Sequence, residues 1–104
     1  MVKLKWFKNR DGELQTQDFV INQKILTKLL KRRVLRSKTH YHQITDSRIK
    51  AHFRLIRFAS GDNLRLYDSN DSLICVIRPY HDDIGTAFYS SKDGAKQAAQ
   101  RLVD

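Results

Sequence analysis

The chain has 104 residues, of which 40% are hydrophobic and 30% are charged. This length and composition predict one folded domain and leave no room for a separate functional module. Twenty Lys and Arg against eleven Asp and Glu give a formal net charge of +9. Such an excess indicates an anionic partner, of which a nucleic acid is the first to consider.

The single cysteine, Cys75, lies in the apolar run from Leu73 to Ile77. It cannot form a disulfide within the chain, and its neighbours predict a small buried side chain instead of a metal ligand or nucleophile. No stretch approaches the roughly 18 apolar residues of a membrane span, and the first residues lack the apolar run of a secretory signal. We therefore expect no membrane partner and a reducing compartment, by default the cytoplasm.

The first predicted elements are a hairpin and a helix. Apolar residues alternate with lysines over residues 2–8, turn-forming residues occupy 9–12, and a second extended stretch covers 14–20. Apolar residues then recur at helical spacing, which predicts a helix over residues 22–34 with Asn22 as its N-cap.

This predicted helix lies in a segment from Phe19 to Thr45 that contains no Asp or Glu. Its positive charges follow one another at i, i+4 spacing, with one more lysine beside them: Lys24, Lys28, Arg32, Arg36 and Lys31. Each like-charge contact of this kind costs about 0.2–0.5 kcal/mol. The arrangement predicts a surface that faces an anion.

Strict alternation resumes at Arg48 and predicts a strand whose apolar residues share one face. The opposite face then has Arg48, Lys50, His52 and Arg54, four side chains that can be positive. Two strands follow, at 64–67 and 73–78, and the second is apolar on both faces and so is expected in the centre of the sheet.

A short strand at 86–89 and a final helix capped by Ser90 or Ser91 complete the predicted order, ββαββββα. The fold class is therefore α+β, an antiparallel sheet with two helices in one domain.

The final helix begins with Ser91-Lys92-Asp93-Gly94-Ala95-Lys96-Gln97-Ala98-Ala99 after an antiparallel sheet. This run resembles the start of the last helix of the double-stranded RNA-binding domain. The resemblance implies that Lys92 and Lys96 reach phosphates and that the alanines pack on the sheet. Asp93 stands where that family has a second lysine, and no Gly-Pro-x-His loop joins the first strands. A sheet followed by Tyr-x-Ser-Lys-x-x-Ala also resembles the arm-binding domains of phage-type recombinases, which bind DNA.

Two further motifs have chemical interpretations. His40 and His42 have the spacing of a histidine pair in metal-dependent nicking enzymes, but no third ligand is placed to complete a site, so we expect no metal and no other cofactor. The run from Arg78 to Asp83 contains a cation, a phenol, His81 and two carboxylates, a set that metal-independent RNA cleavage uses.

The sequence therefore predicts a protein without catalysis of its own that contacts the phosphate backbone of duplex or structured RNA or DNA. The predicted contacts are Lys24, Lys28, Lys31, Arg32, Arg36, Lys50, Arg54, Lys92 and Lys96, which we expect to converge on one surface. Trp6, Phe53 and Phe58 are expected in the core. Two alternatives stay open: an inhibitor of the phage or plasmid type that docks a basic face on an acidic protein, and a toxin ribonuclease that depends on His81.

Overall fold

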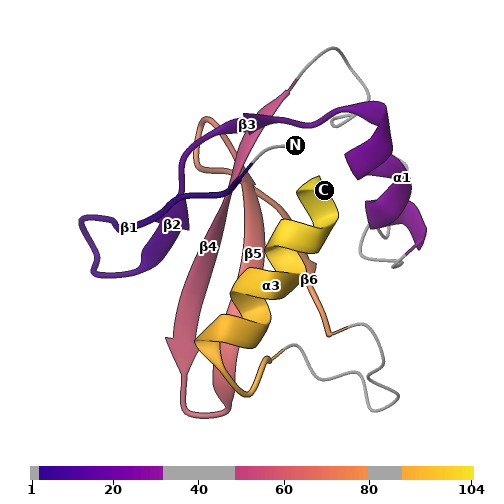
Figure 1. Ribbon diagram of the computed structural model, residues 1–104. Helices are drawn as coiled ribbons and strands as arrows, with labels where there is room; N and C mark the ends of the chain where they lie inside the picture. The colour runs from indigo at the N-terminus through magenta and orange to yellow at the C-terminus, as the bar shows by residue number, and fades with distance from the viewer. Residues whose placement is uncertain (1–2, 32–48, 80–87) are drawn as a thin grey trace.

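The computed structural model describes residues 3–31, 49–79 and 88–104, with the side chains of 30 and 31 left out. It confirms the α+β class, because an antiparallel sheet and two helices follow one another broadly in the predicted order. The elements are β1 (Trp6–Lys8), β2 (Leu14–Thr16), β3 (Phe19–Val20), α1 (Gln23–Lys31), β4 (Lys50–Phe58), β5 (Gly61–Asp68), β6 (Leu73–Ile77) and α3 (Lys92–Val103). Figure 1 shows their arrangement.

The strands pair in the order β1-β2-β4-β5-β6, and β3 pairs separately with β4; all of these pairs are antiparallel. The extended stretch predicted at 14–20 is thus two strands that both lie along β4, separated by Gln17 and Asp18. β4 is the central strand. It continues through a two-residue turn into β5, with Phe58 opposite Gly61.

The expectation that β6 is central is wrong for the part of the chain that the structure describes, where β6 lies at the edge of the sheet. The register between β5 and β6 shifts between Leu66 and Tyr67. At such a bulge two residues of one strand oppose one of the other, and here Ile74 and Cys75 are both buried. The two-sided apolar pattern of β6 therefore comes from the bulge and not from a central position.

Both helices begin where the sequence predicts. Asn22 Oδ1 accepts a hydrogen bond from the Ile25 N–H at 2.9 Å, and Ser91 Oγ accepts one from the Gly94 N–H at 3.0 Å. Each side chain thereby satisfies a backbone N–H that has no partner within the helix. Of the strand predicted at 86–89, the described part shows Tyr89 in an isolated antiparallel bridge with Asp62.

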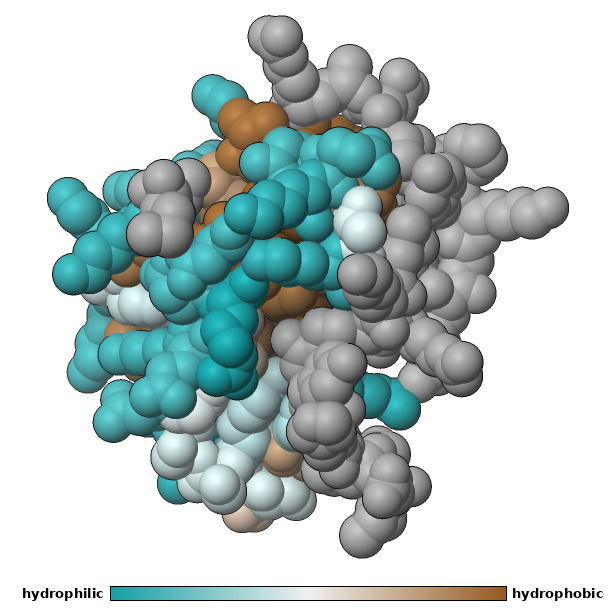
Figure 2. Space-filling model, turned by 45° about the vertical axis from the view of Figure 1, so that its right-hand side comes forward, coloured by the Kyte–Doolittle hydropathy of each residue, from teal (hydrophilic) through white to brown (hydrophobic). Residues whose placement is uncertain are grey.

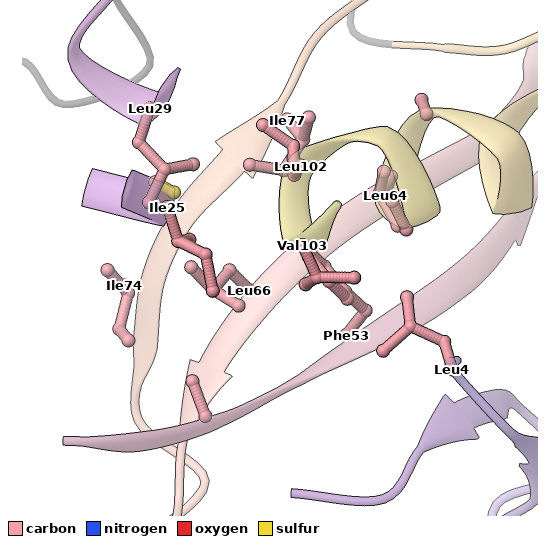
Figure 3. Packing of buried hydrophobic residues seen from close by; sticks show 14 of the residues in the cluster. Leu4, Ile25, Leu29, Phe53, Leu64, Leu66, Ile74, Ile77, Leu102 and Val103 are labelled. Atoms are coloured by element: carbon pink, nitrogen blue, oxygen red, sulfur yellow. The ribbon is translucent and has the colours of Figure 1, made fainter. Parts of the chain in front are cut away.

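The core lies between one face of the sheet and the two helices. β4 and β5 contribute alternate residues, whose side chains point to this face, among them Phe53, Leu55, Leu64 and Leu66. α3 adds three fully buried alanines with Leu102 and Val103, and α1 adds Ile25, Leu26 and Leu29. Figure 3 shows side chains from both helices and from the sheet meeting in this cluster. The small alanines allow α3 to approach the sheet closely.

Because α3 lies in front of the strands in Figure 1 and α1 packs beside it, one face of the sheet is covered. No helix in the described part of the chain is long and apolar enough to cross a membrane.

Candidate nucleic-acid interface

The structure divides the predicted basic residues between two sides of the sheet. Successive side chains of a strand point to opposite faces, and Phe53 of β4 is buried against the helices. Lys50 and Arg54 are an odd number of residues from Phe53 along β4, so their side chains point to the opposite face, which we call the open face. Lys24 and Lys28 of α1 and Lys92 and Lys96 of α3 are on the helical side, so the predicted residues that the structure describes do not form one surface.

On the helical side, Lys24 and Lys92 are exposed. Lys28 donates a hydrogen bond from Nζ to the Arg101 carbonyl oxygen at the end of α3, at 2.8 Å, which joins the two helices. Lys96 Nζ lies 6.0 Å from the centroid of the Trp6 ring, the outer limit of a cation–π contact. Figure 2 shows that the surface on the side of α1 is largely hydrophilic wherever the chain is described.

Several predicted residues lie outside the described residues. These are Arg32 and Arg36, the histidine pair at 40 and 42, His81 with the carboxylates that follow it, and the side chain of Lys31. The ribonuclease alternative and the expectation that the histidine pair binds no metal both concern these residues and stay predictions. Groups of three or more metal-ligating side chains are not found among the residues that are described.

The centre of the open face is one continuous row of side chains that crosses five strands. Register pairs place them side by side: Phe7, Gln15, Arg54, Arg65 and Val76. Arg54 and Arg65 are direct neighbours across β4 and β5. Like charges in directly opposite positions destabilise a sheet, so this pair needs local compensation or an anionic ligand.

Arg54 is compensated from three directions. Its Nε donates to Gln15 Oε1 at 3.1 Å, its Nη2 forms an ion pair with Asp71 Oδ1, and its Cζ lies 4.4 Å from the centroid of the Tyr67 ring. Asp71 has a positive φ of 63°, an uncommon conformation that Asp tolerates better than most residues. The turn before β6 thus directs a carboxylate toward this arginine.

His52, two residues before Arg54 on β4, also lies beside carboxylates. Its buried ring lies between two carboxylates, with Nδ1 3.1 Å from Asp18 Oδ1 and Nε2 3.3 Å from Asp71 Oδ1, and it stacks on Tyr67. Two of the four side chains predicted as a cationic strand face are therefore interleaved with aspartates.

Arg65 differs from Arg54, because no carboxylate of the described residues forms an ion pair with it. Its Nε donates to Asn63 Oδ1 at 2.6 Å, Nη1 lies 3.4 Å from the Tyr67 hydroxyl, and Cζ lies 5.9 Å from the centroid of the Phe58 ring. These contacts are to neutral groups, so they orient the guanidinium without cancelling its charge.

The large hydrophobic residues that the structure describes as exposed are all on the open face: Phe7, Val20, Phe58 and Leu73. Each is at least 41% exposed. The expectation that Phe58 belongs to the core is therefore wrong, because its parity is that of Arg54, whereas Phe53 is buried and Trp6 is partly buried against the core.

The sequence contained a signal for this arrangement. An apolar helix face can pack only on the apolar parity of the strand, Ala51 with Phe53 and Leu55, so the cationic parity had to face away from both helices. Arg65 was missed because its short strand shows little alternation, with Asn63 and Tyr67 also buried.

The lysines as a group have no carboxylate partner within the described residues. None of the ion pairs there involves Lys3, Lys5, Lys8, Lys24, Lys28, Lys50, Lys92 or Lys96. Asp18, Asp62 and Asp71 instead lie against His52, Arg54 and Arg57. Asp68 accepts hydrogen bonds in a turn, from the N–H groups of Asn70 and Ser72.

Comparisons of this chain with models of protein families, with curated proteins and with solved structures return no match.

Proposed function

We propose that this protein binds nucleic acid, chiefly through the phosphate backbone of duplex or structured RNA or DNA, and that it has no catalysis of its own. The single observation that supports this most is the absence of carboxylate partners for the lysines within the described part of the chain. A surface of one sign destabilises the folded state by self-repulsion, and polyanion binding relieves that repulsion.

The start of α3 is the most favourable place for a phosphate on the helical side. Lys92 is its first residue and Lys96 follows one turn later. A lysine in the first turn faces the positive end of the helix dipole, which is unfavourable unless an anion binds there. Asp93 offsets part of this charge. The resemblance of Ser91–Ala99 to a double-stranded RNA-binding helix agrees with this placement.

The proposal is tested by fluorescence anisotropy with labelled duplex RNA, duplex DNA and single strands over a salt series. Phosphate contacts release counterions, so log affinity falls linearly with log salt, with a slope of about −0.9 for each contact on a duplex. We expect a slope of roughly −3 or steeper between about 50 and 200 mM salt. A protein that shows no affinity for any of these probes at low salt contradicts the proposal.

One observation favours a second function, docking on an acidic protein surface as an inhibitor. Phe7, Val20, Phe58 and Leu73 expose apolar area on one face, and exposed apolar patches beside arginine are typical of protein interfaces. If the protein binds no nucleic acid at low salt, this second function becomes the better interpretation, and crosslinking in cells of the source organism is the experiment that identifies the partner.

A further inference from the structure

The open face combines the two features that bind unpaired nucleotides. Proteins that bind single strands place a positive groove along the phosphates and aromatic rings on which bases stack. In the described chain, the open face has two exposed aromatic rings, Phe7 on β1 and Phe58 at the end of β4. Arg65 is on β5, the strand next to β4 on the side away from β1, and its Cζ lies 5.9 Å from the centroid of the Phe58 ring.

We propose that this face binds a single-stranded segment of nucleic acid, with bases stacked on Phe7 and Phe58 and a phosphate at Arg65. The inference rests on the proposed function and adds to it the class of substrate, unpaired nucleotides, and the surface that binds them. The helical side would contact the backbone of an adjacent structured region.

Spacing supports simultaneous contact with one strand. Phe7 and Arg54 share a row two strand intervals apart, and Phe58 is four residues farther along β4. With about 4.8 Å between strands and about 3.4 Å per residue, the two ring-bearing positions are roughly 17 Å apart. A short extended oligonucleotide covers this distance.

Charge supports a nucleic acid over a protein. Arg54 and Arg65 are directly opposite each other, and of these two arginines Arg54 alone forms an ion pair with a carboxylate of the described residues, that of Asp71. The guanidinium of Arg65 is held by Asn63 Oδ1 and faces the Phe58 ring. An oriented guanidinium next to an exposed ring can contact a phosphate while the ring accepts the attached base.

The two phenylalanines differ from the other exposed apolar residues in having a flat ring on which a base can stack. Val20 and Leu73 are as exposed as Phe7 and Phe58, but aliphatic side chains have no flat ring for base stacking. Val20→Ala and Leu73→Ala therefore serve as controls, because they remove apolar area from the same face and leave both aromatic rings in place.

The experiment compares a labelled single-stranded RNA octamer of uridine with a blunt RNA duplex, by fluorescence anisotropy at fixed salt. Phe7→Ala and Phe58→Ala are expected to weaken octamer binding by roughly 5- to 150-fold each, and duplex binding by less than about twofold. Phe7→Tyr keeps the ring and is expected to bind like the parent, whereas Phe7→Leu keeps apolar area alone and is expected to bind like Phe7→Ala. Circular dichroism melts confirm that each variant is folded.

Four results overturn the inference. If the parent binds the duplex but the phenylalanine variants bind the octamer unchanged, the open face is not the site, and the proposed function stands. If Leu73→Ala weakens octamer binding as much as Phe7→Ala does, or if Phe7→Leu binds the octamer like the parent, apolar docking explains the face better than stacking. If sedimentation shows a dimer that Phe7→Ala dissociates, the occupant is a second copy of the chain. If the parent binds no nucleic acid at low salt, the inference and the proposed function fail together.

Discussion

Arg54 on β4 and Arg65 on β5 are directly opposite each other on the face of the sheet that neither helix covers. Their environments differ, because Asp71 forms an ion pair with Arg54, while Arg65 contacts the neutral side chains of Asn63 and Tyr67. Arg54 therefore has a structural role, because its charge is offset within the fold, whereas the positive charge of Arg65 is available to a ligand.

Asp71→Asn is expected to strengthen nucleic-acid binding while it weakens the fold. Asn also tolerates the positive φ at this position, so the main change is the loss of the charge beside Arg54 and His52. For a half-exposed ion pair this loss costs about 0–1 kcal/mol of the free energy of unfolding. Urea denaturation measures the loss, and anisotropy measures the affinity. Unchanged or weaker binding contradicts the assignment of the open face.

Lys92→Gln and Lys96→Gln are each expected to make the salt dependence of duplex binding shallower, by a slope of about 1. Each lysine is assigned one phosphate contact at the start of α3, and a phosphate contact contributes to affinity without regard to sequence. Arg10→Gln, in the exposed turn between β1 and β2, is the control with the same change of charge. Equal effects of all three variants would show that net charge, and not the position on α3, determines binding.

Arg57→Ala is expected to destabilise the fold by about 1–3 kcal/mol. The carboxylate of Asp62 is 1% exposed, and Arg57 Nη1 donates to its Oδ2 at 2.9 Å from a side chain that is 67% exposed. Removal of the guanidinium leaves a buried charge without this partner. Arg57→Lys keeps the charge and is expected to lose less. If Arg57→Ala unfolds at the same urea concentration as the parent, the ion pair makes no contribution.

Gly61 and Gly12 provide a matched pair for backbone strain. Both have positive φ, 135° and 78°, but a Cβ at position 12 meets nothing nearby, whereas at position 61 it would overlap the Tyr89 carbonyl oxygen. Gly12→Ala is expected to cost about 1 kcal/mol and Gly61→Ala clearly more, because the bridge between Asp62 and Tyr89 must separate. Thermal melts compare the two variants. Similar melting temperatures would contradict the close approach of residue 89 to β5.

Cys75 is expected to resist alkylation in the folded protein. Burial raises the pKa of its thiol from the ordinary value of 9.0 to about 12, and only the thiolate reacts. Iodoacetamide at about pH 8 should therefore label the unfolded chain in urea much faster than the native protein. Rapid labelling of the native protein would show that β6 opens readily.

The same burial makes stability depend on pH. Above pH 9.0 the thiol ionises in the unfolded chain but stays protonated in the folded one up to about pH 12. The unfolded state then binds fewer protons, so the free energy of unfolding falls by up to about 1.4 kcal/mol per pH unit in that interval. Cys75→Ala lacks the thiol, so the difference between the parent and this variant in the free energy of unfolding, measured against pH, isolates the contribution of Cys75 from that of other groups. Parallel curves for the two proteins would contradict the prediction.

Local signals in the sequence were sufficient for much of the fold. Asn22 and Ser91 cap helices through bonds to residues three positions away, so a short window contains the information. The strand alternation that buries Phe53 is equally local. The bulge beside Leu66 depends on the pairing of two strands, which the pattern of one strand does not specify. Because the bulge buries two successive residues of β6, the apolar pattern of that strand led to the wrong prediction that it is central.

The candidate site was less predictable, because it depends on contacts between distant residues. Asp71 compensates Arg54 across 17 positions of sequence, and Asp18 reaches His52 across 34. Neither contact follows from composition or periodicity. The exposure of Phe58, in contrast, follows from its parity with Arg54, so consistent use of the alternation would have found one of the two exposed rings.

The most direct test of nucleic-acid binding is a titration of the ¹⁵N-labelled protein with an RNA hairpin that has a single-stranded loop, followed in ¹H–¹⁵N spectra at low salt. We predict shifts of the amide signals of Lys92 and Lys96 at the start of α3 and of Phe7 and Arg65 on the open face, all of which decrease as salt is added. Spectra that do not change on addition of the RNA would contradict the account.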